Sequence, residues 1–193
     1  FPVDREPIPL TVLQKVKDAF FGVTCSQFGQ DEAGRAGLHT MYAPCGVDTE
    51  SFNIMEPGDA RRQLGFDSDA FIVAMVADNK GFPSRKALPQ QIEAFARFHK
   101  KCPNSLLYLH TCTSSQRGGL DLAMLVHMLG IQDAVVPCDQ SMYIQGFPTD
   151  YMKSIYNAAN VLCHVTMDEG FGVPIVEAQA CGTPVIAGGW TSM

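Results

Sequence analysis

Apolar runs alternate with amphipathic segments along most of this 193-residue chain. The apolar runs predict strands buried on both faces of a parallel sheet, at residues 70–77, 105–111, 134–138, 161–165 and 184–187. The segments between them have a helical period and predict helices at residues 85–102, 120–129, 148–159 and 174–181. Strands that alternate with helices at this spacing predict an α/β fold with a doubly wound, Rossmann-like parallel sheet.

The first forty-odd residues have a weaker pattern. They predict short helices at 11–19 and 26–37 and short strands at 21–25 and 40–43. Pro44-Cys-Gly-Val-Asp48 then breaks the pattern with proline and glycine, as linkers do. We therefore expect residues 1–43 to be the tail of a preceding domain and residues 44–193 to form a second domain.

The segment from Glu169 to Glu177 has the most distinctive composition in the chain. Its Gly-x-Gly turn should allow positive φ and the close approach of a ligand, and Pro174 suits the first turn of a helix. Backbone N–H groups at the start of that helix would attract an anion. Two carboxylates beside an anion site suit a ligand that carries hydroxyls as well as phosphate. Thr166 and Glu169 also fit a capping box, a structural use that could coexist with binding.

Two other loops should lie at the same edge of the sheet, where ligands bind in such folds. Arg85-Lys86 lies at the start of a predicted helix. Taken alone, the pair is better explained as solvated surface charge, but its placement at the ligand edge suits a diphosphate. The loop from Cys138 to residue 146 could offer backbone N–H and C=O groups to a nucleobase. His110 and His164 end strands nearby. His164 could reach a phosphate or a sugar hydroxyl, although a histidine at such a position is at least as often a buried core residue.

Composition narrows the possible functions. The net charge of −6 argues against a nucleic-acid partner, and no apolar run is long enough to cross a bilayer. Seven cysteines, an odd number without C-x-x-C spacing, predict a reducing, cytoplasmic setting without a zinc site. No P-loop, dinucleotide fingerprint or Ser-His-Asp pattern is present, which argues against those chemistries.

The stretch from Glu169 to Ile186 resembles the E-x7-E signature of retaining glycosyltransferases of the GT-B fold, the family 4 or group 1 type. Residues 44–52 resemble the interdomain linker of that family, and Arg85-Lys86 resembles its basic pair. The resemblance implies the C-terminal half of a GT-B fold. Residues 1–43 would end the acceptor-side domain, and residues 44–193 would form the donor-binding domain, truncated at its C-terminus.

The resemblance also implies a role for each matched residue. Arg85 and Lys86 would hold the donor diphosphate, Glu169 the hydroxyls of the donor sugar, and Glu177 those of the ribose. The catalytic residues would be Glu169, Arg85 and Lys86, with no metal and no cofactor, because cations replace Mg²⁺ at the leaving diphosphate. With the loop at Cys138, the donor-binding set becomes Gly170, Phe171, Gly172, Val173, Glu177 and Cys138.

The implied reaction is retaining transfer from a nucleoside-diphosphate sugar to a sugar, lipid or protein acceptor. The resemblance implies a cytoplasmic protein that could lie peripherally at a membrane, since membrane association in this family often comes from the N-terminal domain. Val165-Thr166 departs from the usual Pro-Ser, and residues 78–84 replace a Gly-rich turn. We expect this chain alone to bind the donor without transferring the sugar. A non-catalytic nucleotide-sugar-binding domain and a GT-B-like epimerase stay open as alternatives.

Overall fold

A computed structural model describes residues 1–193. In it, the chain forms two compact units. The larger unit comprises residues 47–166 and 174–187. The smaller unit comprises residues 1–46, 167–173 and 188–193. The segment 167–173, which carries the first half of the Glu169–Glu177 motif, therefore belongs to the smaller unit, while most of the helix that follows it belongs to the larger one.

The larger unit contains a five-stranded sheet in which every neighbouring pair is parallel. Its strands, in chain order, are β3 (Phe71–Val76), β4 (Ser105–His110), β5 (Val135–Pro137), β6 (Val161–His164) and β7 (Val185–Ala187). Their order across the sheet is β5-β4-β3-β6-β7. This confirms the predicted doubly wound α/β sheet.

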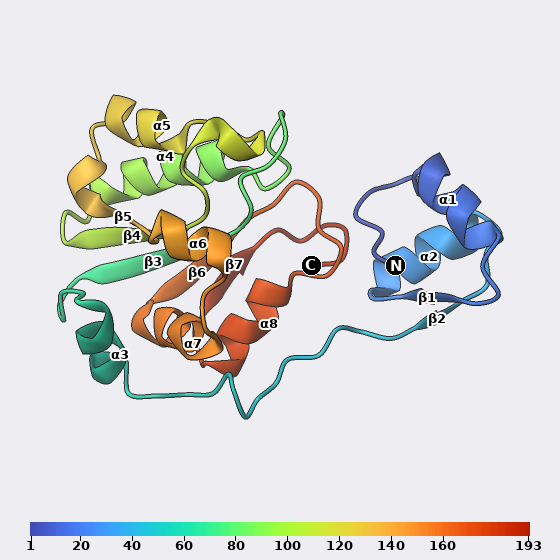
Figure 1. The fold of residues 1–193 in the computed structure, drawn as a ribbon, viewed down its shortest axis with the longest axis horizontal. Helices are drawn as coiled ribbons and strands as arrows, with labels where there is room; N and C mark the ends of the chain where they lie inside the picture. The colour runs from blue at the N-terminus through green and yellow to red at the C-terminus, as the bar shows by residue number, and fades with distance from the viewer. The chain divides into compact units, whose positions relative to one another are not determined.

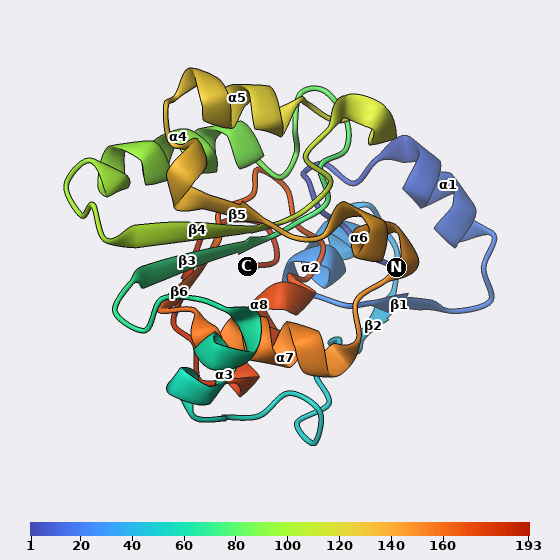
Figure 2. The ribbon, with the colours of Figure 1, turned by 60° about the vertical axis from the view of Figure 1, so that its left-hand side comes forward.

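Helices cover both faces of this sheet (Figures 1 and 2). α4 (Leu88–His99) and α5 (Leu122–Met128) pack on one face. The other face carries α7 (Thr149–Ala158) and α8 (Val173–Ala180), with α3 (Pro57–Leu64) packed beside α7. Two single 3₁₀ turns and a short helix complete the unit: Ser115–Arg117, Gln132–Ala134 and α6 (Gln140–Gln145).

The alternation of side chains along the strands explains why the strands read as continuous apolar runs. Val73 and Met75 of β3 pack under α4 and α5, whereas Ala74 and Val76 pack under α7 and α8. Because both faces are covered, successive residues are all buried although they point in opposite directions. Leu107 of β4, which is fully buried, anchors the first of these two clusters.

The smaller unit contains α1 (Leu10–Lys17), β1 (Gly22–Thr24), α2 (Gln27–Arg35) and β2 (Thr40–Tyr42). The two strands form a parallel pair, and α2 makes the crossover connection that a parallel pair needs. The hydroxyl of Ser26 caps α2 by accepting a hydrogen bond from the Gly29 N–H at 3.0 Å.

Three local expectations were wrong. α4 begins at Leu88 rather than Arg85, because turns occupy residues 81–86 and Ala87 is left-handed (φ 47°), so Arg85-Lys86 precedes the helix. The loop after β5 contains α6, whose first turn is capped by the Asp139 carboxylate. Thr166 and Glu169 do not form a capping box, because α8 begins only at Val173.

Candidate functional site

The order of the strands in the larger unit points to a binding edge. The chain runs from β3 outward to β4 and β5, then returns to the other side of β3 with β6 and β7. The direction of winding therefore reverses between β3 and β6, and ligands of doubly wound sheets bind outside the carboxyl ends of the strands at such a switch point. The segments that leave β3 and β6 there begin at Ala77 and Val165.

The β3–α4 segment carries Arg85 and Lys86, which are both partly exposed. Asn79 holds this segment to the loop after β4. Its side-chain amide is fully buried, donates to the carbonyl oxygens of Cys112 (2.9 Å) and Leu120 (2.7 Å), and accepts from the Leu120 N–H (3.1 Å). The segment that carries the two predicted cations is therefore fixed, a few residues before them, by the buried side chain of Asn79. Sequence reasoning missed Asn79 because its partners lie more than thirty residues away in the chain.

Ser84, directly before Arg85, is also buried, and its hydroxyl has no hydrogen-bond partner. A buried hydroxyl without a partner is unusual, because buried polar groups are nearly always satisfied. The first backbone N–H groups of α4 likewise have no side-chain cap, because the N-cap residue is Ala87. Donors are thus available in the segment that precedes this helix.

Glu177 lies half-buried on α8, where the hydroxyl of Tyr156 donates to its Oε2 at 2.6 Å. Tyr156 belongs to α7 and is completely buried. Burial raises the pKa of the Glu177 carboxyl above its ordinary value of 4.5, and the hydrogen bond from Tyr156 opposes that rise. Burial and the neighbouring carboxylate raise the pKa of Tyr156, so that the phenol keeps its proton. The pair leaves the other carboxylate oxygen of Glu177 for a further partner.

Cys138, the residue expected to meet a base, is buried against the end of β4. Its N–H donates to the Leu109 carbonyl oxygen at 3.0 Å, and its carbonyl oxygen accepts from Gln140 Nε2 at 2.8 Å. The N–H is therefore already used within the protein, and only a second lone pair of the carbonyl oxygen could accept from a ligand. Burial raises the pKa of the Cys138 thiol to about 11, which makes it unreactive.

The smaller unit contains the other predicted donor-binding residues, Glu169 to Val173. Glu169 is buried, and its Oε1 accepts a hydrogen bond from the Gly170 N–H at 3.1 Å. Gly172 has the expected positive φ, 86°. Gly170 does not adopt positive φ. Its lack of a side chain is required by packing instead, because a Cβ there would lie 2.7 Å from Cβ of Pro2.

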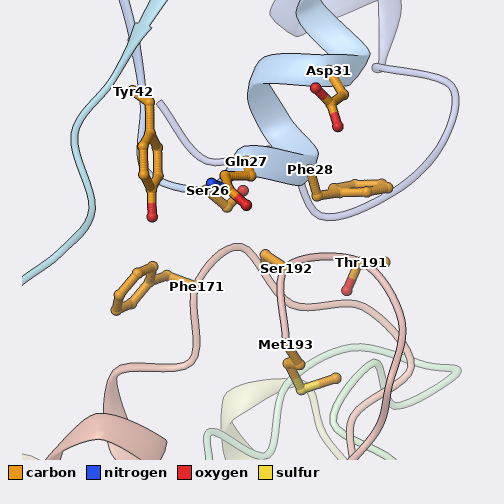
Figure 3. A pocket seen from close by; sticks show the side chains of 9 residues that line it. All are labelled: Ser26, Gln27, Phe28, Asp31, Tyr42, Phe171, Thr191, Ser192 and Met193. Atoms are coloured by element: carbon orange, nitrogen blue, oxygen red, sulfur yellow. The ribbon is translucent and has the colours of Figure 1, made fainter.

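A cavity of about 430 Å³ in the smaller unit lies beside this segment (Figure 3). Phe171 and Tyr42 bring two aromatic rings to its wall, and Asp31 points toward it from α2. Its remaining lining residues are Ser26, Gln27, Phe28, Thr191, Ser192 and Met193. The hydroxyl of Ser192 also donates to the Glu169 carbonyl oxygen. Phe171 is therefore the predicted donor-binding residue that lines this cavity.

The two histidines at the strand ends are both buried. Burial lowers the pKa of His110 to about 4, and its Nδ1 lies 3.1 Å from the Tyr108 hydroxyl, which identifies it as a neutral core residue at neutral pH. His164 is 2% exposed. No group of three His, Cys, Asp or Glu side chains is arranged to hold a metal ion. None of the helices is both long and apolar enough to span a membrane.

Comparison with known proteins identifies the family of this chain. The family model for glycosyl transferases group 1 matches residues 58–192. The D-inositol 3-phosphate glycosyltransferase of Geodermatophilus obscurus is 32% identical over 166 residues, which are 81% of this chain and 34% of that protein. The enzyme of the same name from Kribbella flavida is 31% identical over 148 residues, or 74% of this chain and 33% of that protein. The chain thus spans about a third of the length of these relatives.

Comparison with solved structures identifies the same kind of fold. Sucrose-phosphate synthase from Thermosynechococcus elongatus superposes with a TM-score of 0.76 at 29% identity, over 93% of this chain and 44% of that chain. HepE of Anabaena, in complex with UDP and glucose, gives a TM-score of 0.72 at 24% identity, over 92% of this chain and 46% of that chain. The chain matches the C-terminal half of these GT-B folds. It belongs to the group 1 family of glycosyltransferases.

Proposed function

We propose that the protein containing this chain transfers a sugar, with retention of anomeric configuration, from a nucleoside-diphosphate sugar to an acceptor, and that this chain binds the donor. The observation that carries the proposal is the switch point between β3 and β6. The segment with Arg85 and Lys86 leaves one strand there, and the segment that leads into the Glu169–Glu177 motif leaves its neighbour.

Each role follows from chemistry. Arg85 and Lys86 bind the diphosphate, helped by the uncapped start of α4 and the hydroxyl of Ser84. These groups stabilise the negative charge that develops on the leaving nucleoside diphosphate, which is the task that a metal ion performs in other enzymes. Glu177 accepts from the ribose hydroxyls through the oxygen that Tyr156 leaves available.

Glu169 and the backbone of Gly170, Phe171, Gly172 and Val173 hold the donor sugar. The cavity beside Phe171 supports this assignment, because aromatic rings with a carboxylate and hydroxyls suit a sugar. Residues 1–43 would complete an acceptor-side domain, and Cys138 would contribute its carbonyl oxygen to the base. The acceptor is a sugar, lipid or protein.

A thermal-shift screen of the full-length protein tests the proposal. Nucleoside-diphosphate sugars with uracil, guanine and adenine bases should be compared, because ligands that bind only the folded state raise Tm. We expect the donors that carry one of these bases to raise Tm, and we expect Glu177→Ala to abolish that shift. A protein that none of these donors stabilises would refute donor binding.

Activity distinguishes the alternatives. NMR of the product from an α-linked donor should show an α-linkage, as retention requires. Donor binding without transfer or hydrolysis, with Arg85 and Glu169 intact, would indicate a non-catalytic binding domain. Release of an epimerised sugar without an acceptor would indicate an epimerase.

A further inference from the structure

Gln91 joins the two segments that leave the switch point. It lies on α4 with only 5% of its surface exposed. Its Nε2 donates to the carbonyl oxygen of Lys86 at 2.7 Å, and its Oε1 accepts from the N–H of Val165 at 3.1 Å. Lys86 is the second predicted cation, and Val165 is the first residue after β6. One side chain therefore connects the segment that carries Arg85 and Lys86 to the first residue of the segment that leads into the Glu169–Glu177 motif.

The chemistry of this link needs an amide. Lys86 offers a carbonyl oxygen and Val165 offers an N–H, so the connecting side chain must donate at one end and accept at the other. A carboxylate accepts only and an ammonium donates only. Because Gln91 stands on a regular helix whose own backbone is hydrogen-bonded, it holds both irregular segments against a rigid element.

We infer that Gln91 is a positioning residue that fixes the diphosphate-binding cations relative to Val165, where the segment that leads into the motif leaves β6. The inference rests on the proposed function. Gln91 acts through the backbone of Lys86 and Val165 and does not itself touch the ligand. Preorganised charges lose much of their effect when they are displaced by about 1 Å, so the link matters most for the part of the ligand that carries charge.

This role predicts a selective effect within one ligand. The ribose contact depends on Glu177, which Tyr156 holds from α7 without Gln91. Loss of the Gln91 link should therefore weaken binding of a nucleoside diphosphate much more than binding of the matching nucleoside. A role confined to general stability would weaken both ligands alike or neither.

Gln91→Met tests the inference, because methionine keeps the length of the side chain and removes both hydrogen bonds. Gln90→Met is the matched control, since Gln90 is exposed on the same helix. Calorimetric titration of the full-length protein should compare UDP, GDP and ADP with uridine, guanosine and adenosine. For the diphosphate that binds best, we expect Gln91→Met to raise Kd on the order of tenfold, with the nucleoside Kd within about twofold of wild type.

Diphosphate affinity that survives Gln91→Met would overturn the inference, as would an equal loss for diphosphate and nucleoside. If Gln91→Met does not fold, Gln91→Asn, which is too short to reach both partners, must show the same selective loss, and unchanged affinity there would also overturn it. Wild-type protein that binds none of the three diphosphates refutes the proposed function and this inference with it. Wild-type binding with an unaffected variant refutes only the role of Gln91.

Discussion

Removing the hydroxyl of Tyr156 should change both the stability of the protein and the pH dependence of nucleotide binding. Tyr156 is fully buried and donates to Glu177 Oε2 at 2.6 Å. Tyr156→Phe deletes that donor and leaves the ring in place against Phe52, whose ring centroid lies 6.0 Å away. The substitution therefore isolates one hydrogen bond without opening a large cavity.

The magnitude follows from the charge and exposure of the acceptor. A hydrogen bond to a charged group contributes about 1.5–3 kcal/mol to stability. Because Glu177 is only half-buried, water can replace part of the lost contact, and we expect the lower end, about 1–2 kcal/mol. For a chain of this size that loss lowers Tm by about 2–8 °C.

The effect on binding has a definite direction. Burial already raises the pKa of Glu177, and the Tyr156 hydrogen bond opposes the rise, so Tyr156→Phe should raise this pKa further. Under the proposed function, a protonated Glu177 accepts ribose hydroxyls less well than the carboxylate does. Affinity for a nucleoside should therefore begin to fall at a higher pH in the variant than in wild type as the solution is acidified.

Calorimetric titration of the nucleoside between pH 4 and 8 and thermal melts measure the two effects. Tyr108→Phe is the matched control, because Tyr108 is equally buried but its hydroxyl meets His110 rather than a carboxylate. The control should lose stability without moving the pH profile. A profile that moves in neither variant, or equally in both, would show that the Tyr156 hydrogen bond does not tune Glu177.

Four further outcomes are expected. The raised folded-state pKa of Glu177 stabilises the fold fully below pH 4.5, and this stabilisation is lost as the pH rises through the folded-state pKa. Glu177→Gln should therefore raise Tm at pH 7 but not at pH 4. The same substitution should weaken nucleoside binding in titrations. Gly119→Ala should lower the free energy of unfolding by about 1–3 kcal/mol in denaturant melts, since its Cβ would lie 2.2 Å from the Asn79 carbonyl oxygen. The control Gly58→Ala on α3 should be neutral or stabilising, because its Cβ would meet nothing closer than 3.7 Å. Leu107→Ala, at a fully buried site, should cost about 2–5 kcal/mol in the same assay. EDTA should leave the rate of sugar transfer unchanged, and a loss restored by Mg²⁺ would contradict a metal-independent site.

The strands of the larger unit were predictable because burial on both faces removes polar residues from them. β3 is such a case, with five of its six residues buried. Gly65 and Gly182 follow helix ends for a similar local reason, since both adopt positive φ after a last helical turn. Signals of this kind depend only on neighbours in the chain.

The elements that were missed depend on less obvious or more distant partners. α6 has six residues and begins with the cap from Asp139 to the Met142 N–H at 2.8 Å, a signal that loops share with helices. The roles of Gln91 and Tyr156 could not be read from local pattern, because their partners Val165 and Glu177 lie 74 and 21 residues away. Nothing local distinguishes such a residue from any other polar residue on a helix.

The buried amides of the larger unit nevertheless share a physical logic. Asn79 and Gln91 bond the backbone of the segments after β3, β4 and β6, and Asn157 of α7 accepts from the Met55 N–H at 2.8 Å. Each amide satisfies backbone groups of an irregular segment that passes close to the core, where an unpaired group would be costly. A buried amide on an otherwise apolar helix face therefore indicates a loop held in place. When the loop lies at the carboxyl edge of a parallel sheet, as for Gln91, the hydrogen bonds that stabilise the fold are, under the proposed function, also the ones that position the diphosphate-binding segment.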